Sequence, residues 1–399
     1  MEILINELNV ESFSIIILGI SFLTSYFMIP KLIGVIRFKK LMDDPNVRSS
    51  HINKTPTLAG LVFFVSMIIC LFFIRYFDSM DISFNIIVGL TILLIIGLKD
   101  DLVVLSVKAK VISQLFAITF ILLNQDVHFN NFHGFLGITE IPLILTISLS
   151  YLSMMFIINA YNLIDGIDGL AAMLGIIIFS IFALLFYKIE LNFYFLLSII
   201  SIGFLIAFLR YNLSKNNKIF MGDTGSMIVG FLIGILTLRF LALDVAQLEN
   251  INVLPQNIFV VTLSILFFPA IDVIRVIVIR LINKTGAFTP DRRHLHHVFI
   301  DKGLPHIKAS ITIAVSSILT FLFIYLANTY LSYVGLMVLF VFITFFTYYL
   351  LMLLDSDHMV GIHRKKIKTY IPEGIYYREF RLRKKVIIFL KKIFYRDLL

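Results

Sequence analysis

Cysteine and charged residues are both scarce in this chain. Among 399 residues there is a single cysteine, Cys70, which excludes a disulfide framework and a metal site built from thiolates. Charged residues make up 15% of the sequence, against roughly 25% in ordinary soluble domains. Hydrophobic residues make up 59%. The composition therefore excludes an ordinary soluble domain and predicts an all-α integral membrane protein.

Apolar runs of roughly 20 residues, the length that crosses a bilayer, recur along the sequence. They predict a polytopic bundle of about eleven transmembrane helices in one domain, residues 1–354, followed by a basic cytoplasmic amphipathic tail, residues 355–399. The expected spans are 12–33, 58–77, 84–98, 109–124, 141–160, 170–187, 191–209, 227–243, 256–281, 309–328 and 332–354.

Lysine and arginine divide the expected loops into two sets. Only Arg75, Lys188 and Arg239 fall on one side of the bundle, and the rest of the 34 basic residues fall on the other. Because basic loops stay in the cytoplasm, this distribution predicts an external N-terminus and a cytoplasmic C-terminus in the inner (cytoplasmic) membrane. No basic residue precedes Lys31, so we expect the first span to be retained rather than cleaved as a signal peptide.

The net charge of +9 needs no nucleic-acid partner, because the basic loops account for it. The tail mixes Lys and Arg with Phe, Ile and Leu, which suits an interfacial helix on anionic membrane lipid. A simple positive-inside anchor explains the tail equally well, and we assign it no catalytic role.

One polar block, N-A-Y-N-L-I-D-G-I-D-G-L, interrupts the apolar sequence after the fifth expected span. Its polar members, three residues apart, are Asn159, Asn162, Asp165 and Asp168. Ionisable groups at a membrane boundary are costly and usually functional. Gly166 and Gly169 predict that the helix opens into a loop here. The block is therefore expected to be part of a site.

Four other polar motifs are expected on the same cytoplasmic face. They are D-D-P-N-V-R-S-S-H at 43–51, K-D-D at 99–101, G-D-T-G-S at 222–226 and D-R-R-H-L-H-H at 291–297. A transporter or flippase would need a polar route through the bilayer, whereas these motifs gather on one face. Their placement favours a catalytic site at the cytoplasmic interface.

Two of these motifs also have purely structural explanations. Asp100 and Asp101 could cap a helix end, although carboxylates at a helix C-terminus oppose its dipole; otherwise one of them serves as a base or metal ligand. The G-D-T-G-S motif fits a loop followed by an N-cap. It equally fits an anion site made by helix N-terminal amides, with Asp223 beside a phosphate-bound Mg²⁺.

The basic motifs are open to the same two interpretations. The histidine motif comprises Arg292, His294, His296 and His297. Adjacent arginines and the absence of cysteine favour an anionic ligand such as pyrophosphate over zinc, and a solvated basic loop is the alternative. Arg48 and His51 fit either loop surface or a phosphate site, and Lys110 fits either a membrane anchor or a phosphate partner.

Taken together, the motifs offer oxygen ligands for Mg²⁺, cations for phosphate and spare carboxylates at a membrane surface. Phosphoryl transfer requires positioned cations that stabilise the negative charge of the phosphate groups. The residues therefore predict transfer of a phosphoryl-containing group from a soluble, charged donor to a lipid.

In their order along residues 12–354, the five motifs resemble those of the polyprenyl-phosphate N-acetylhexosamine-1-phosphate transferases. The resemblance implies that undecaprenyl phosphate attacks the β-phosphate of a UDP-N-acetylhexosamine, releasing UMP, with Mg²⁺ or Mn²⁺ as cofactor. Such enzymes start O-antigen, common-antigen and teichoic-acid assembly, and the family allows a homodimer. The H-x-H-H form after P-D-R-R is more similar to the UDP-N-acetylglucosamine branch than to the peptidoglycan branch, which uses UDP-MurNAc-pentapeptide.

The resemblance also implies roles for individual residues. Asp100 and Asp101 would activate or orient the lipid phosphate, while Asn162 and Asp223 would be the metal pair. The residues expected to bind substrate are Asp165 and Asp168 near the uracil, Lys110 on donor phosphate, and His294, His296, His297, Arg292, Arg48, His51 and Asn159. Ala59–Gly60 stands where the family often has two glycines, which loosens one backbone contact and touches no expected ligand.

Overall fold

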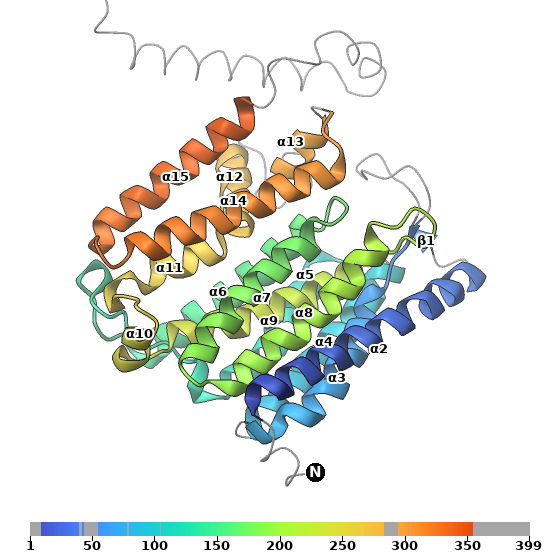
Figure 1. Cartoon of the computed structure of the whole chain (residues 1–399), viewed down its shortest axis with the longest axis horizontal. Helices are drawn as coiled ribbons and strands as arrows, with labels where there is room; N and C mark the ends of the chain where they lie inside the picture. Colours follow the sequence, from blue (N-terminus) through green and yellow to red (C-terminus); the bar gives the residue numbers. More distant parts are fainter. Residues whose placement is uncertain are drawn as a thin grey trace, which may run out of the picture. The chain divides into compact units, whose positions relative to one another are not determined.

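In the computed structural model of the chain, the regular structure of the described residues is helical apart from one pair of two-residue strands (Figure 1). It describes residues 9–39, 42–43, 55–77, 80–103, 105–282, 294–301 and 303–353. The first helices are α2 (Val10–Lys39), α3 (Ala59–Ile74), α4 (Met80–Leu102), α5 (Val107–Leu122), α6 (Leu143–Ile164), α7 (Leu170–Lys188), α8 (Asn192–Asn212) and α9 (Gly222–Leu241). The later ones are α10 (Val245–Asn250), α11 (Ile258–Ile265), α12 (Phe267–Ile282), α13 (Leu295–Asp301), α14 (His306–Ala327) and α15 (Tyr333–Leu353).

Short elements complete the described chain. The 3-10 turns are η1 (Arg75–Phe77), η2 (Gln125–Val127), η3 (Phe135–Gly137) and η4 (Pro255–Asn257). Strand β1 (Met42–Asp43) pairs antiparallel with β2 (Thr55–Pro56). The chain divides into two compact units, Met1–Thr347 and Tyr348–Leu399, and the second is described only as far as the end of α15.

Eight of the described helices are long and apolar enough to cross a membrane. They are α2, α3 continued by η1, α4, α6, α7, α8, α9 and α14. The predicted class, an all-α integral membrane protein, is confirmed by this set. The other predicted spans, 109–124, 256–281 and 332–354, coincide with shorter apolar segments in α5, the pair α11 and α12, and α15.

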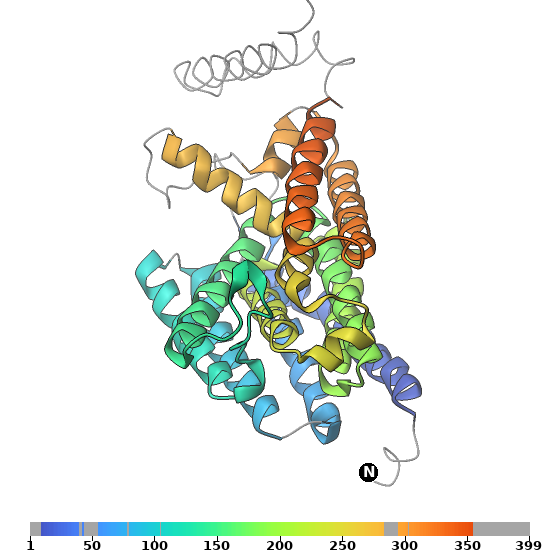
Figure 2. The same ribbon diagram turned by 90° about the vertical axis from the view of Figure 1, so that its left-hand side faces the viewer.

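The predicted span 256–281 is divided in the structure, because α11 ends at Ile265 and α12 begins at Phe267. Pro269 explains the break: it has no backbone N–H to bond to the carbonyl of Ile265, and proline is tolerated in the first turn of a helix. Figure 2 shows α12 extending outward from the other helices. The interruption was not expected from the sequence.

Helix α9 forms the centre of the first unit, and nearly all of its side chains are buried. Between membrane helices, close packing depends on small residues rather than on the hydrophobic effect. Gly230 is such a residue, since a Cβ there would lie 2.8 Å from Cα of Ile158 in α6. The contact brings α6 and α9 together one residue before the polar block begins at Asn159.

The start of α9 is also bound to the start of α3. The Phe220 amide donates to the carbonyl of Pro56, and the amides of Ala59 and Gly60 donate to the carbonyls of Phe220 and Met221. The chain thereby brings the segment before α3 against the G-D-T-G-S motif.

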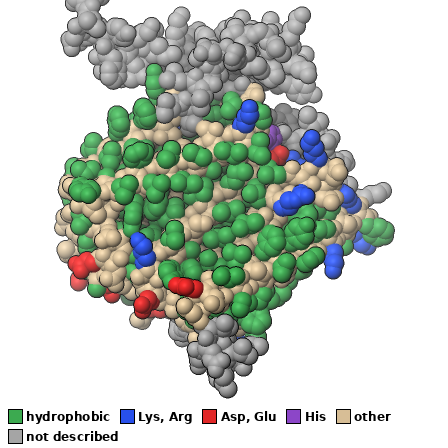
Figure 3. Space-filling model, in the orientation of Figure 1, with side chains coloured by type: hydrophobic (Ala, Val, Ile, Leu, Met, Phe, Trp, Pro, Cys, Tyr) green, Lys and Arg blue, Asp and Glu red, His purple; other side chains and the backbone are tan. Residues whose placement is uncertain are grey.

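Basic and acidic side chains separate along the helices. Figure 3 shows Lys and Arg mostly toward one end of the visible face, and Asp and Glu mostly toward the other. The basic end includes Arg37 and Lys39 at the end of α2, whereas Glu11 lies in the first turn of the same helix. Three of the polar motifs, K-D-D, the Asn/Asp block and G-D-T-G-S, lie where α4 and α6 end and α7 and α9 begin.

Candidate functional site

Lys110 lies between two carboxylates at the centre of the polar cluster. Its Nζ is 3.1 Å from Oδ2 of Asp100 and 3.2 Å from Oδ1 of Asp223. The Asp100 carboxylate is fixed further by the Leu105 amide, which donates to its Oδ1 at 2.7 Å. Three helices, α4, α5 and α9, therefore meet at one ammonium group, whereas the sequence predicted only that these three side chains share one face.

Asn162 extends this cluster to α6. Its Nδ2 donates to Oδ1 of Asp223 and to Oγ of Ser226, the latter at 2.7 Å. The Ser226 hydroxyl donates in turn to the Gly222 carbonyl at 2.9 Å. Asn162 and Asp223, the expected metal pair, are therefore in direct contact.

The oxygen donors of this cluster fit a hard divalent cation. The Asp100 and Asp223 carboxylates carry free lone pairs, and rotation of the Asn162 amide by 180° would place its oxygen beside Asp223. Among the described residues, no group of three or more His, Cys, Asp or Glu side chains is placed to hold a metal ion by itself. The donor set suits Mg²⁺, which keeps waters and takes substrate phosphate oxygens as its remaining ligands.

Asp101, the neighbour of Asp100, binds the first turn of α9 through its carboxylate. Its carboxylate accepts hydrogen bonds from the Asp223 amide at 2.7 Å, the Thr224 amide at 3.2 Å and the Thr224 hydroxyl at 2.6 Å. Gly222 has φ 75°, and a Cβ there would lie 2.8 Å from the Asp101 carboxylate oxygens. Asp101 therefore satisfies amides that α9 leaves open and places a negative charge at its positive end.

This contact corrects two expectations about the G-D-T-G-S motif. Its Asp, Thr and Ser side chains do not cap their own helix, because the N-cap residue is Met221 and makes no side-chain cap bond. Nor do the amides of Asp223 and Thr224 await a substrate anion, since Asp101 already accepts from both. The helix N-terminus does bind an anion, but the anion is a carboxylate of α4.

The polar block opens into a turn as predicted, with α6 ending at Ile164 and α7 beginning after Gly169, which has φ 81°. Asp165 lies half-buried directly after α6. Burial raises the pKa of Asp165 to about 7, and the nearby carboxylates of Asp223 and Asp101 raise it further. Negative charge is therefore crowded here, as expected for a place that receives a cation.

Asp168 is paired differently. Its Oδ2 lies 2.6 Å from Nζ of Lys218 and 3.3 Å from Nδ1 of His306. Burial alone would raise the pKa of Asp168, but the bonds and charges of His306 and Lys218 outweigh it and lower the pKa. The expected role of Asp168 at the uracil stays a prediction.

Asn159 lies one turn before Asn162 and is held inside the bundle. Its Nδ2 donates to Oε1 of Gln114 at 3.0 Å and to the Met155 carbonyl at 2.7 Å. Gln114 is fully buried and lies one turn after Lys110. This contact shows Asn159 joining α6 to α5 rather than facing an open surface.

The histidine motif is fixed to α12 through its first histidine. Nδ1 of His294 lies 2.8 Å from Oδ2 of Asp272, and the Leu295 amide donates to Oδ1 of Asp272 at 2.8 Å. The backbones of His296 and His297 belong to α13, but their side chains lie outside the described part of the chain. Arg292, Arg48 and His51 also lie outside the described residues.

Sequence reasoning missed several side chains that hold the site together. They are Gln114, Lys218, Asp272 and His306. Asp272 carried a usable signal, because a carboxylate within an apolar span is costly and usually functional. The others had none, since their partners are far away in the sequence.

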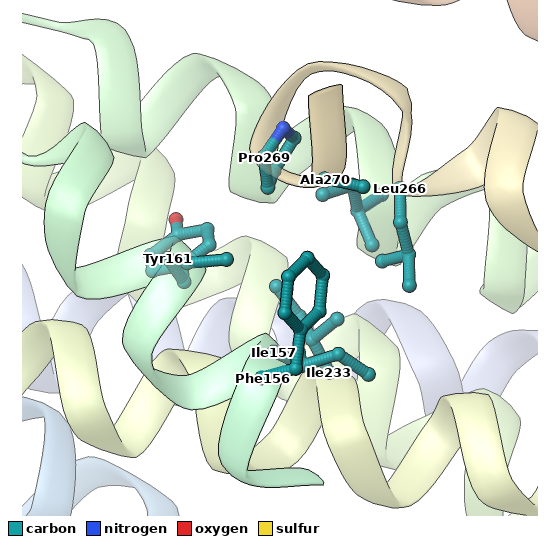
Figure 4. Close-up of a pocket in the computed structure, with 9 residues that line it drawn as sticks. Phe156, Ile157, Tyr161, Ile233, Leu266, Pro269 and Ala270 are labelled. Atoms are coloured by element: carbon teal, nitrogen blue, oxygen red, sulfur yellow. The ribbon is translucent and has the colours of Figure 1, made fainter. Parts of the chain in front are cut away.

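A small apolar pocket lies between α6, α7, α9 and the break before α12 (Figure 4). The lining residues are Phe156, Ile157, Ala160 and Tyr161 of α6, Ile178 of α7, Ile233 of α9, and Leu266, Pro269 and Ala270 at the break before α12. The pocket therefore lies where the divided span meets the helix that carries Asn162.

Known proteins resemble this chain over most of its length. The model of glycosyl transferase family 4 matches residues 83–241. The undecaprenyl-phosphate alpha-N-acetylglucosaminyl 1-phosphate transferase of Haemophilus influenzae is 30% identical over 315 residues, covering 75% of this chain and 84% of that protein. A probable undecaprenyl-phosphate N-acetylglucosaminyl 1-phosphate transferase of Bacillus subtilis is 28% identical, covering 66% of this chain and 71% of that protein. The decaprenyl-phosphate N-acetylglucosaminephosphotransferase of Mycobacterium leprae is 26% identical, covering 66% and 70%.

Proposed function

Because the chain belongs to glycosyl transferase family 4, we propose that it transfers N-acetylglucosamine 1-phosphate from UDP-N-acetylglucosamine to undecaprenyl phosphate and releases UMP. The names of its relatives from Haemophilus influenzae, Bacillus subtilis and Mycobacterium leprae all describe a polyprenyl-phosphate acceptor and this sugar. The product would start a cell-surface polysaccharide such as O-antigen, common antigen or teichoic acid.

The meeting of Asp100, Lys110, Asn162 and Asp223 carries this proposal. These side chains come from four helices, yet contacts of 3.2 Å or less connect them all. Phosphoryl transfer needs little covalent chemistry from a protein but requires positioned charges around the phosphate groups. The cluster supplies both signs of charge at one end of the bundle.

In the proposed reaction, an oxygen of the lipid phosphate attacks the β-phosphorus of the donor. The bond from that phosphorus to the bridging oxygen breaks, and UMP leaves with the electron pair. Asp100, whose carboxylate faces the cluster, would orient the lipid phosphate or take its proton. Lys110 would turn its ammonium toward the donor phosphates and stabilise the growing negative charge.

Asn162 and Asp223 would hold Mg²⁺, or Mn²⁺ in its place. The bound ion would neutralise charge on the diphosphate. Asp101 would act indirectly, because its hydrogen bonds to the first turn of α9 orient the Asp223 side chain. Asp165 and Asp168 would lie at the donor nucleoside, and the histidine motif would hold pyrophosphate or sugar.

We also propose eleven crossings of the cytoplasmic membrane, with the N-terminus outside and the site and C-terminus on the cytoplasmic face. The count adds α5, α15 and the pair α11 and α12, taken as one crossing, to the eight helices that are long and apolar enough to cross a membrane. The basic side chains gathered at the site end support the same orientation (Figure 3).

The test uses the purified full chain in detergent with undecaprenyl phosphate, Mg²⁺ and UDP-N-acetylglucosamine, and it identifies the released nucleotide. UMP together with sugar in the lipid phase would support the proposal. UDP would mean ordinary glycosyl transfer and overturn it. Turnover only with UDP-MurNAc-pentapeptide would assign the chain to peptidoglycan synthesis, and turnover only with another UDP-N-acetylhexosamine would change the donor.

A further inference from the structure

His306, the first residue of α14, joins the polar block to a helix that no predicted motif includes. Its Nδ1 lies 3.3 Å from Oδ2 of Asp168 and 3.4 Å from the backbone nitrogen of the same residue. One turn later, the Ser310 hydroxyl donates to the Asp168 carbonyl at 2.8 Å. Helix α14 therefore contacts the carboxylate, the amide and the carbonyl of one aspartate.

A second segment, the one that leads into α9, holds the same loop from another side. Nζ of Lys218 is 2.6 Å from Oδ2 of Asp168. The next amide, that of Gly169, donates to Oδ1 of Asn212 at 2.6 Å, and Nδ2 of Asn212 donates to the Ile219 carbonyl at 3.0 Å. Any shift of Asp168 would therefore be transmitted to residues 218–219, only a few positions before Asp223.

We propose that His306 is a positioning residue for the donor. Through Asp168 it fixes the loop 165–169 against the segment 218–220, and so determines the shape of the surface that receives the nucleoside end of the donor. The inference rests on the proposed function, in which Asp165 and Asp168 lie at the nucleoside. It adds α14 to the elements that define the site.

The chemistry of the contact suggests a discriminating substitution. The imidazole Nδ1 either accepts from the Asp168 amide or, when protonated, donates to its carboxylate. An asparagine amide can do both by rotation, and its oxygen and nitrogen are attached to Cγ, as Nδ1 is. A glutamine carries the same amide one carbon further from the backbone. Asparagine at position 306 should therefore preserve the hydrogen bonds to Asp168, whereas glutamine and alanine should lose them.

The experiment measures initial rates of UMP release by the full chain in detergent for the wild type, His306→Ala, His306→Asn, His306→Gln and Lys308→Ala. Loss of a charge-assisted hydrogen bond should raise KM for UDP-N-acetylglucosamine about tenfold in the Ala and Gln variants, with kcat within about twofold. The Asn variant should stay within about threefold of the wild-type KM. Lys308 is exposed two residues along the same helix, so its alanine variant is the matched control.

A second readout separates this inference from the proposed function. Isothermal titration calorimetry with UMP should show the same order of affinities without any turnover. An unchanged KM and UMP affinity in His306→Ala would overturn the inference, as would equal losses of kcat and thermal stability in all three His306 variants with KM unchanged. If His306→Ala does not fold, the test is the difference in KM and UMP affinity between His306→Asn and His306→Gln, and equal values in these two variants would overturn the inference. A wild type that binds UMP but releases none would overturn the function alone.

Discussion

At the scale of single residues, the two adjacent aspartates of the K-D-D motif have different surroundings. Asp100 contacts Lys110 in the cluster, whereas Asp101 accepts three hydrogen bonds from the first turn of α9. We expect Asp100→Asn to lower kcat by about 10² to 10⁴-fold, the usual contribution of a general base, with a smaller fall in unfolding temperature than Asp101→Asn shows. Asp101→Asn should instead lower the unfolding temperature along with activity, because it weakens charge-assisted bonds worth about 1.5–3 kcal/mol each.

Rates of UMP release and thermal unfolding in detergent test this division, with Asp126→Asn at the exposed opposite end as control. Full activity in Asp100→Asn would show that the Asp100 carboxylate is not needed for the reaction. An Asp101→Asn variant with normal stability but no turnover would restore the original expectation that both carboxylates act directly.

Asp165 makes a second residue-scale prediction, concerning pH. Its pKa in the folded chain is raised to about 7, whereas an unfolded chain ionises the group near its ordinary value of 3.8. The unfolded state therefore loses its proton first, and the folded state loses stability progressively as pH rises between these values and no further above them. Asn cannot ionise, so the unfolding temperature of Asp165→Asn should exceed that of the wild type by more at pH 8 than at pH 5.

The measurement is a series of unfolding scans in EDTA, because a bound divalent cation would relieve the same repulsion. Added Mg²⁺ should therefore shrink the difference at pH 8. A difference that is independent of pH would show that Asp165 is already ionised at pH 5.

At the scale of elements, the position of α9 depends on glycines in its neighbours. A Cβ on Gly60 of α3 would lie 2.3 Å from the Gly225 nitrogen, and one on Gly97 of α4 would lie 2.4 Å from Cα of Thr224. Both clashes involve backbone, which cannot move aside. Gly60→Ala and Gly97→Ala should each destabilise the fold by about 1–3 kcal/mol, as overpacking does, and lower turnover by displacing Asp223.

Gly19 of α2 is the matched control, because nothing lies within 4 Å of a Cβ built there. Thermal unfolding and UMP release are compared for the three alanine variants. Wild-type behaviour in Gly60→Ala would mean that α9 does not need this close approach.

The helices themselves could largely be predicted, since a span must be apolar over a bilayer thickness and this pattern is local in sequence. The sequence also predicted that Asp100, Lys110, Asn162 and Asp223 share one face, because basic loops alternate along the chain. It did not predict that Asp101 caps α9, because Asp101 and its partner Asp223 are 122 positions apart in the sequence. The contact of His306 with Asp168, across 138 positions, was hidden for the same reason.

At the scale of the whole molecule, the separation of charge along the helices predicts an orientation in the membrane. Basic loops remain cytoplasmic, so the end that carries Lys215 should face the cytoplasm and the end that carries Glu190 should face outward. Both side chains are exposed, and the single native cysteine, Cys70, is buried. Replacing Cys70 with Ala leaves a background for single cysteines at either end.

In intact spheroplasts, a membrane-impermeant maleimide should label Glu190→Cys and leave Lys215→Cys unlabelled until the membrane is opened. The reverse labelling pattern would mean the opposite orientation in the membrane. The site would then face the outside and would have no access to the cytoplasmic nucleotide sugar. Labelling of both positions in intact cells would mean that the chain does not divide its ends between two compartments. The proposed reaction requires the first outcome, because its soluble donor and its lipid acceptor meet only on the cytoplasmic face.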